Sequence, residues 1–255
     1  MYSSFLRGTL SQAAIALIFA GGCGHRMNSK SLPKQFLTVN GKPIIIHTLE
    51  VFDRHPQIDA IIVSCVAEYI TWLEEALVRF QIHKVKAVTA GGKTGQLSIK
   101  NGLEKACELF PADSVVLIHD GVRPLIDLGT ITNNIASVLE HGSAVTVTPA
   151  SETVGILGSH GDLGDIIKRQ QVVICRAPQS FRLGEVLASH RRALADGLTD
   201  ITDTASLMRI YGKKLATVTG PVDNIKITTQ RDFYTLKTLF DLREFRQLLE
   251  TKARE

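Results

Sequence analysis

Short, continuous apolar runs recur along this chain, and longer segments with apolar residues at helical spacing separate them. The first run, at residues 13–19, ends at glycines, which is typical of a strand buried on both faces of a parallel sheet. The segments between the runs are long enough to cross back over the sheet as helices. The alternation therefore predicts a βαβ architecture. The other runs lie at 60–65, 85–89, 114–119 and 144–148.

The rest of the chain predicts further elements and one irregular segment. Helical spacing predicts helices at 44–52, 68–80, 96–110, 130–140, 183–195, 203–211 and 231–249. Two more strands are expected near 215–219 and 225–228. Between residues 151 and 174 short extended pieces are broken by glycines, which indicates a projecting β-arm. Because 255 residues suit one large domain, we predict an α/β fold with a single Rossmann-like, three-layer domain over residues 1–255, a mostly parallel central sheet and the arm at 151–174.

Charge and cysteine content narrow the function classes. The chain has 29 basic and 25 acidic residues and no long basic run, which argues against nucleic-acid binding. Its four cysteines are scattered without a CxxC pair, which argues against structural zinc and favours a cytoplasmic protein. The apolar run ending in AGGC at 20–23 resembles a lipoprotein processing site, but cleavage there would remove the first strand. No stretch approaches the roughly 20 apolar residues of a membrane span.

A glycine-rich turn, FAGGCGHRM at 19–27, follows the first run. Ligands of open α/β sheets bind at the carboxyl ends of the strands, and glycines let backbone N–H groups approach phosphate oxygens. Arg26 adds a permanent charge with bidentate geometry. The turn lacks both the GxxxxGK[ST] phosphate loop and a complete GxGxxG dinucleotide motif. Alone, it fits a phosphate site and a plain turn with an exposed arginine equally well.

Further motifs follow in order along the chain: PKQF at 33–36, GKPII at 41–45, HDGVRP at 119–124, APQSF at 177–181, ITDTAS at 201–206 and DNIKIT at 223–228. With them, the sequence resembles the nucleoside-diphosphate-sugar pyrophosphorylase superfamily, and within it the cytidylyltransferases acting on 2-C-methyl-D-erythritol 4-phosphate and on D-ribitol 5-phosphate. The chain departs from the family pattern at Ala177, where a threonine is usual. It also departs at GGKTGQLS, residues 91–98, where an arginine and acidic residues are common.

The resemblance implies two catalytic cations and a nucleotide site. Arg26 and Lys34 are implied to stabilise the transition state at the α-phosphate. The chemistry agrees, because fixed cations lower the barrier to attack of one phosphate on another. The alternative is a pair of solvated basic residues. The implied nucleotide-binding residues are Phe19, Ala20, Gly21, Gly22, Gly24, Gly91, Gly92, Ser98 and Asp120.

The resemblance also implies a metal and an acceptor site. Asp120 and Asp223 are the implied carboxylates for Mg²⁺ on the triphosphate, and a structural, helix-capping aspartate is the alternative for each. Thr153 and Arg169 lie in the arm, which in the family crosses to a partner subunit, so a homodimer is implied. For Thr153 the alternative is a threonine that simply favours a strand. The implied acceptor residues are Arg123, Thr153, Arg169, Asp203 and Lys226.

The reaction that the resemblance implies joins CTP and a polyol phosphate into a CDP-polyol and pyrophosphate. D-ribitol 5-phosphate is the favoured acceptor, because the spacing from Arg26 to Lys34 is one residue longer than we expect of methylerythritol phosphate enzymes. 2-C-methyl-D-erythritol 4-phosphate and a related sugar phosphate are the alternative acceptors. UTP or GTP is an alternative nucleotide, and a nucleotide-binding module without turnover is the alternative of another class.

Overall fold

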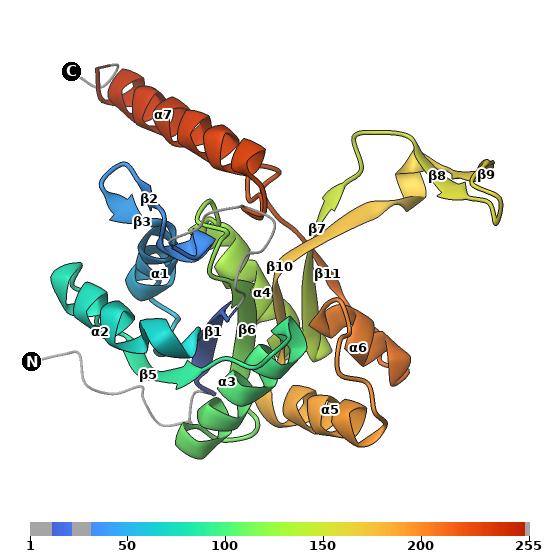
Figure 1. Ribbon diagram of the computed structural model, residues 1–255, viewed down its shortest axis with the longest axis horizontal. Coiled ribbons are helices and arrows are strands. Elements are labelled where there is room, and N and C mark those ends of the chain that lie inside the picture. The colour runs from blue at the N-terminus through green and yellow to red at the C-terminus, as the bar shows by residue number, and fades with distance from the viewer. Residues whose placement is uncertain (1–11, 22–31, 253–255) are drawn as a thin grey trace, which may run out of the picture.

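The computed structural model describes residues 12–21 and 32–252, and a seven-stranded sheet forms its centre (Figure 1). The strand order is β11-β7-β10-β6-β1-β4-β5. β1 pairs in parallel with β4 and β6, β4 with β5, and β7 with β11, so the sheet is mostly parallel, as predicted. The strands are β1 (Ala14–Ala20), β4 (Ala60–Cys65), β5 (Val85–Ala90), β6 (Val115–Asp120), β7 (Ser143–Pro149), β10 (Val173–Arg182) and β11 (Thr217–Thr219).

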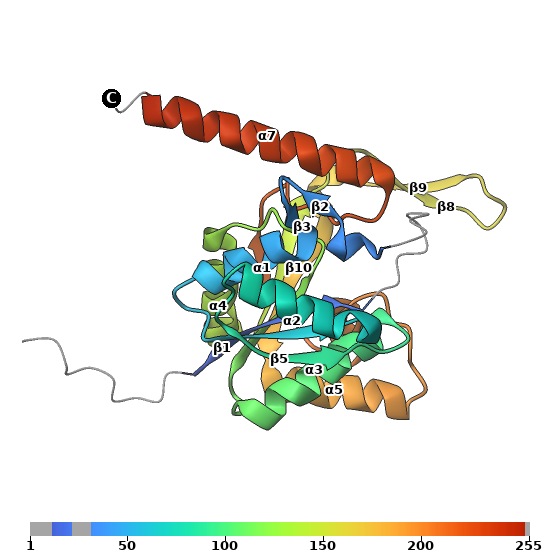
Figure 2. The ribbon, with the colours of Figure 1, turned by 60° about the vertical axis from the view of Figure 1, so that its left-hand side comes forward.

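Helices cover both faces of this sheet and make three layers (Figures 1 and 2). Successive side chains of a strand point to opposite faces, and those of β1 pack into a hydrophobic cluster on each face. Its Ile18 packs in one cluster with α1, α2 and α4, whereas Leu17 packs in another with α3, α5 and α6. The helices are α1 (Ile44–Arg54), α2 (Ile70–Arg79), α3 (Gly95–Leu109), α4 (Leu128–His141), α5 (Leu183–Ala195) and α6 (Thr204–Ile210).

The arm is a hairpin of its own. β8 (Val154–Leu157) and β9 (Leu163–Ile167) pair antiparallel, separately from the central sheet, and they project from the body of the protein (Figures 1 and 2). The apolar side chains of Leu157 and Leu163 are largely exposed. The β-arm expected between residues 151 and 174 is therefore confirmed.

The last helix, α7 (Gln230–Lys252), confirms the expected C-terminal helix and also leaves the body. Its first half packs Leu236 and Phe240 into a small cluster with Ile44 and Leu125. Farther along, Phe245 is exposed. Within residues 12–21 and 32–252, no helix combines the length and the apolarity that crossing a membrane requires.

The predicted strands differ from the observed ones in two places. β10 was not predicted, because its sequence VICRAPQSFR has no continuous apolar run, yet it lies antiparallel between β7 and β6. The strand expected at 225–228 is wrong, because the backbone there bonds to no strand. Ile227 N donates to Val122 O at 3.0 Å, and Thr228 N donates to the Asp232 carboxylate at 2.8 Å. Loop and cap contacts thus replace the expected strand pairing.

Two short strands and three 3-10 turns complete the described chain. β2 (Thr38–Val39) and β3 (Lys42–Pro43) form a two-stranded hairpin that leads into α1. The turn η2 (Lys34–Phe36) precedes this hairpin, η3 (Ala67–Tyr69) precedes α2, and η4 (Arg169–Gln171) joins the arm to β10.

Candidate functional site

The carboxyl ends of the central strands bring the sequence motifs together. Phe19 near the end of β1 stands beside Asp120 at the end of β6, and Ala20 stands beside Cys65 at the end of β4. Gly91, after β5, donates its N–H to Cys65 O at 2.6 Å. This is the edge at which open α/β sheets bind ligands.

Gly21, the first residue after β1, packs against the glycine loop after β5 at this edge. A Cβ on Gly21 would lie 2.4 Å from Ser98 Oγ and 3.4 Å from the Cα of Gly91. Ser98 is itself fixed, because its Oγ accepts from Gly92 N at 3.0 Å and donates to Thr94 O at 2.9 Å. Thr94 caps α3 by accepting from Leu97 N. The loop after β5 is therefore a fixed support for Gly21.

Gly21→Ala should destabilise the protein by about 1–3 kcal/mol, because the added methyl group has no room against Ser98 and Gly91. Urea unfolding of the two proteins measures the difference. Gly129→Ala in α4 is the matched control, since a Cβ there meets only Asp127 Oδ1 at 3.5 Å, and it should unfold at the same or higher urea concentration. Equal stability of Gly21→Ala and the parent protein would contradict the close packing of Gly21 against Ser98 and Gly91.

Lys34 stands on a turn that is tied to the end of β1. It begins η2, and the next residue, Gln35, is buried and donates from Nε2 to Ala20 O at 2.7 Å. Phe36 anchors the other side of the turn by stacking on Tyr69, with ring centroids 4.7 Å apart. The sequence pattern assigned no role to Gln35, yet Gln35 couples the position of Lys34 to the glycine turn. Arg26, Gly22 and Gly24 lie outside the described residues.

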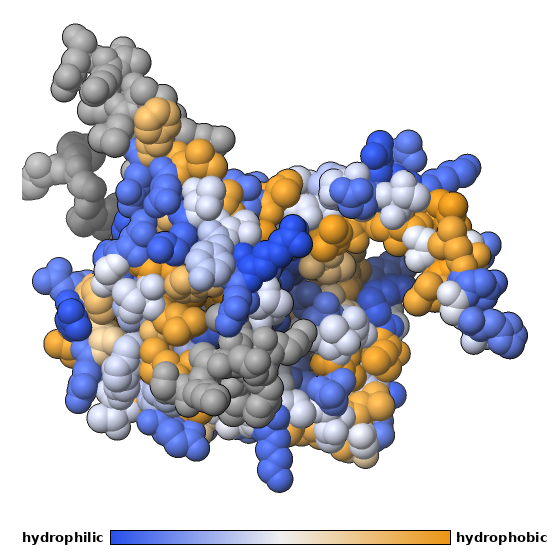
Figure 3. Space-filling view, turned by 45° about the horizontal axis from the view of Figure 1, so that its top comes forward, coloured by the Kyte–Doolittle hydropathy of each residue, from blue (hydrophilic) through white to orange (hydrophobic). Residues whose placement is uncertain are grey.

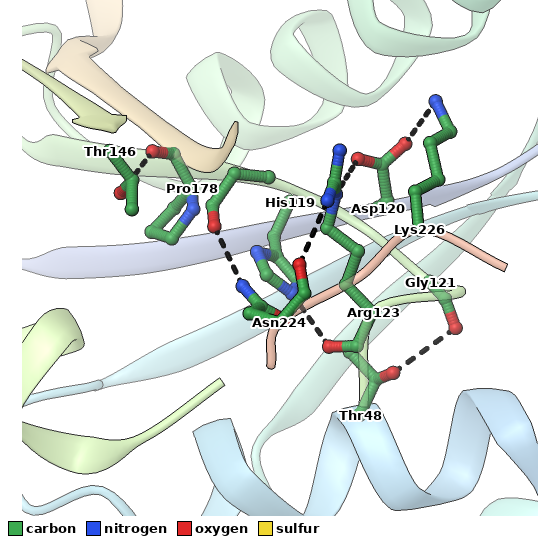
Figure 4. A network of polar contacts seen from close by, with 10 residues as sticks. Thr48, His119, Asp120, Gly121, Arg123, Thr146, Pro178, Asn224 and Lys226 are labelled. Atoms are coloured by element: carbon green, nitrogen blue, oxygen red, sulfur yellow. Dashed lines mark hydrogen bonds and ion pairs between the residues drawn. The ribbon is translucent and has the colours of Figure 1, made fainter. Parts of the chain in front are cut away.

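Asp120 is the centre of a buried charge cluster (Figure 4). Its Oδ2 accepts from Arg123 Nε at 2.7 Å, and Lys226 Nζ lies 2.7 Å from its Oδ1. Burial on its own would raise the pKa of Asp120, but the charges of Lys226 and Arg123 outweigh it and hold this pKa below the ordinary range. Asp120 is therefore a fixed carboxylate that keeps two cations in place.

A hydrogen-bond network holds the segment that carries Lys226 (Figure 4). Arg123 donates from Nη1 to Asn224 O at 2.9 Å. Asn224, fully buried, donates from Nδ2 to Ala177 O on β10 at 3.0 Å. On the other side, His119 Nε2 lies 3.1 Å from Arg123 O. The network joins the end of β6, β10 and residues 224–226, so Asn224 positions Lys226, a role that the sequence pattern did not indicate.

A cavity of about 280 Å³ opens beside this network. It brings together five of the residues that the resemblance implied: Phe19, Asp120, Arg123, Asp203 and Lys226. Gln96, one of the departures from the family pattern, also lines the cavity and holds its wall by donating to Leu198 O at 2.7 Å and accepting from Ile201 N at 2.8 Å.

The remaining implied residues lie elsewhere. Arg169 is exposed at the base of the arm, where its Nη1 donates to Ser151 O at 3.3 Å. Thr153 is likewise exposed, as is Asp223. None of the three lines the cavity around Asp120. Asp203 lines it but also caps α6, with Oδ1 accepting from Ser206 N at 2.7 Å.

The described residues contain no cluster of three or more histidine, cysteine or acidic side chains that would hold a metal ion. Mg²⁺ commonly needs only one or two protein carboxylates when substrate phosphates supply other ligands. Asp120 fits that role, because its buried Oδ1 has Lys226 as its one side-chain partner among the described residues. The donor set thus fits a metal that arrives with a phosphate ligand.

Two buried histidines give the fold a defined pH dependence. Burial lowers the pKa of His119 and of His190 to about 4 from an ordinary 6.5, so both are neutral in the folded protein at neutral pH. The unfolded chain therefore binds more protons between these two values. Stability should be full above pH 6.5 and should fall toward pH 4, by on the order of 3 kcal/mol for each group.

Urea unfolding across this pH range measures the loss. His190→Gln should reduce the pH dependence, because glutamine does not titrate. His160→Gln, at an exposed position of the arm, should leave it as in the parent protein. A His190→Gln protein with undiminished pH dependence would contradict the assignment.

Comparison with known proteins gives one matching family and whole-length relatives. The family model of IspD, 2-C-methyl-D-erythritol 4-phosphate cytidylyltransferase, matches residues 14–241. A ribitol-5-phosphate cytidylyltransferase of Streptococcus agalactiae serotype III is 50% identical over 234 residues, which cover 92% of this chain and 98% of that protein. One from Vibrio parahaemolyticus is 47% identical, with 90% and 97% covered.

More distant similarities agree. A 2-C-methyl-D-erythritol 4-phosphate cytidylyltransferase of Geotalea uraniireducens is 38% identical, over 85% of this chain and 92% of that protein. The crystal structure of 4-diphosphocytidyl-2C-methyl-D-erythritol synthase from Anaerococcus prevotii superposes with a TM-score of 0.79 at 26% identity, covering 90% of this chain and 96% of that one.

Proposed function

Because the chain belongs to the family of 2-C-methyl-D-erythritol 4-phosphate cytidylyltransferases, we propose that it transfers CMP from CTP to D-ribitol 5-phosphate, giving CDP-ribitol and pyrophosphate. The observation that carries the acceptor is the 50% identity, over 98% of its length, to a protein named for ribitol 5-phosphate. Identity to the Geotalea methylerythritol phosphate enzyme is 38%. We propose a cytoplasmic location for this reaction.

The triphosphate of CTP is proposed to bind over the two glycine loops. Gly21 and Gly91 pack against each other at the ends of β1 and β5, and without side chains they let a phosphate group approach the backbone closely. The proposed nucleotide-binding residues are Phe19, Ala20, Gly21, Gly22, Gly24, Gly91, Gly92, Ser98 and Asp120.

Lys34 and Arg26 are the proposed catalytic cations. They would neutralise charge on the α-phosphate as an oxygen of the acceptor phosphate attacks in line and pyrophosphate leaves. Gln35 supports this role, because it fixes the Lys34 turn to Ala20. The reaction needs no general base on the protein, since the attacking phosphate is already an anion. Buried His119 therefore has no catalytic role in this proposal.

Mg²⁺ is the proposed metal, and it would supply charge neutralisation on the triphosphate. Asp120, at the end of β6, would hold it from the protein side. Asp223 remains a proposed second carboxylate, although it is exposed and does not line the cavity.

The acceptor is proposed to enter the cavity lined by Arg123, Asp203 and Lys226. Thr153 and Arg169, the other proposed acceptor residues, belong to the arm and lie outside this cavity. A homodimer in which the arm reaches the neighbouring subunit would reconcile the two positions. The arm supports association, because the apolar side chains of Ile156, Leu157 and Leu163 are more than half exposed. Figure 3 shows apolar surface on the part that projects from the body.

Pyrophosphate release tests the proposal directly. The protein is given CTP and Mg²⁺ with D-ribitol 5-phosphate, 2-C-methyl-D-erythritol 4-phosphate or a panel of sugar phosphates, and the four nucleoside triphosphates then compete at a fixed acceptor concentration. We expect the highest kcat/KM with D-ribitol 5-phosphate and CTP. A preference for 2-C-methyl-D-erythritol 4-phosphate would show that it, and not D-ribitol 5-phosphate, is the acceptor. A preference for UTP or a purine nucleotide would show that CTP is not the nucleotide substrate. If CTP binds but no acceptor yields pyrophosphate, the protein is a nucleotide-binding module without turnover.

A further inference from the structure

Arg176 is a cation in the acceptor cavity to which neither the motifs nor the charge cluster gives a role. It lies on β10, half-buried, and lines the cavity with Asp120, Arg123 and Lys226. Its one hydrogen bond among the described residues is long, from Nε to Thr148 Oγ1 at 3.4 Å. No carboxylate of the described chain lies within ion-pair distance of its guanidinium.

The other cations of the cavity already have a carboxylate. Arg123 and Lys226 both contact Asp120, at 2.7 Å each. Asp203, the second acidic residue of the lining, accepts a backbone hydrogen bond of α6. Three cations therefore face two carboxylates, and Arg176 carries the charge that the protein itself leaves unbalanced.

The surroundings of Arg176 make this charge unfavourable without a ligand. Burial, and then the positive charge of Arg123, lower the pKa of Arg176. Two guanidinium groups that face one cavity are best accommodated when an anion lies between them. A guanidinium also matches a phosphate group with two parallel N–H donors, so phosphate is the anion that suits it.

The strand order indicates that the anion at Arg176 is the acceptor phosphate and not the triphosphate. β10 pairs with β6 on the side away from β1, so β6 separates Arg176 from the glycine loops that follow β1 and β5. The triphosphate, bound over those loops, would lie on the far side of Asp120. An anion between Arg176 and Arg123 would thus lie on the side of Asp120 from which the acceptor approaches the triphosphate.

Resting on the proposed function, we propose that Arg176 binds the phosphate of the acceptor and selects for a phosphorylated polyol. Arg123 and Lys226 remain committed to Asp120, and Arg176 supplies the net positive charge that an incoming phosphate meets.

Steady-state kinetics of Arg176→Gln and Arg176→Lys test this. In Arg176→Gln the KM for D-ribitol 5-phosphate should rise about 10- to 100-fold, as expected for loss of a charge-assisted hydrogen bond, with the KM for CTP nearly unchanged. The KM of Arg176→Lys for D-ribitol 5-phosphate should lie between those of the parent and of Arg176→Gln, since a point charge remains without bidentate geometry. Arg191→Gln, which removes an exposed arginine of α5, is the matched control. Urea unfolding checks that each variant is folded.

A binding measurement without turnover separates this proposal from the proposed function. Calorimetry with inorganic phosphate should give binding to the parent protein and at least tenfold weaker binding to Arg176→Gln, whereas unphosphorylated ribitol should bind neither. Equal phosphate affinity of the two proteins, or a rise in the KM for CTP instead of the acceptor, would overturn the role of Arg176. A parent protein that binds phosphate through Arg176 but does not use D-ribitol 5-phosphate would refute only the proposed acceptor.

Discussion

Asp120→Asn should lower turnover by at least about 100-fold and, in the same protein, reduce the free energy of unfolding by about 3 kcal/mol. The loss of stability follows from burial: the Arg123 side chain is 10% exposed, and without the carboxylate its charge is left unpaired. The loss of turnover follows from Lys226, which would no longer be held 2.7 Å from Oδ1, and from the loss of the proposed metal ligand. Pyrophosphate release and urea unfolding measure the two effects.

The double variant Asp120→Asn/Arg123→Gln separates these effects. It removes the unpaired charge as well, so part of the lost stability should return while turnover stays low. Recovery of turnover together with stability would mean that Asp120 acts only through the fold. Unchanged stability of the single variant would contradict the buried ion pair.

Lys34→Ala should lower kcat by about 100-fold or more, because it removes a cation proposed to contact the transition state. The change should leave stability close to that of the parent, since Gln35 and Phe36, not Lys34, are the buried residues of the turn. Single-turnover pyrophosphate release measures the effect. Lys237→Ala, an exposed lysine of α7, is the control for loss of one positive charge.

Gln35→Ala extends this test from the cation to its support. If Gln35 acts only by placing Lys34, Gln35→Ala should lower kcat, and the double variant Gln35→Ala/Lys34→Ala should be no slower than Lys34→Ala. Additive losses would show that Gln35 has a separate effect. Normal kcat in Lys34→Ala would remove Lys34 from the catalytic residues.

The elements that could be predicted are those whose sequence carries its own signal. β1 and β4 are buried on both faces, so they are continuous apolar runs, and α5 has helical spacing throughout. β10 carries no such signal, because its first residues are exposed at the base of the arm and only its later residues reach the core. At 225–228, Ile225 and Ile227 alternate with polar residues as in a strand, but their backbone serves a loop.

The site was predictable where a motif marks it. Lys226 is far from Asp120 and Arg123 in the sequence. The family motifs pointed to all three residues, and the structure places them in one cavity. Gln35, Asn224 and Arg176 were missed because their roles depend on which backbone carbonyl, or which charge, the fold brings opposite them. No spacing in a single sequence encodes that.

The strand β10 has a consequence for how association and substrate affinity are related. Its residues form, in order, the base of the arm, the wall of the cavity at Cys175 to Gln179, and the buried core at Phe181. The three parts belong to one continuous strand, with a register shift between Cys175 and Gln179. If a partner that moves the arm also shifts the cavity wall, then by thermodynamic linkage a bound acceptor changes the affinity of the subunits for each other to the same extent. Changes in the arm sequence would therefore be expressed as altered substrate affinity as well as altered assembly.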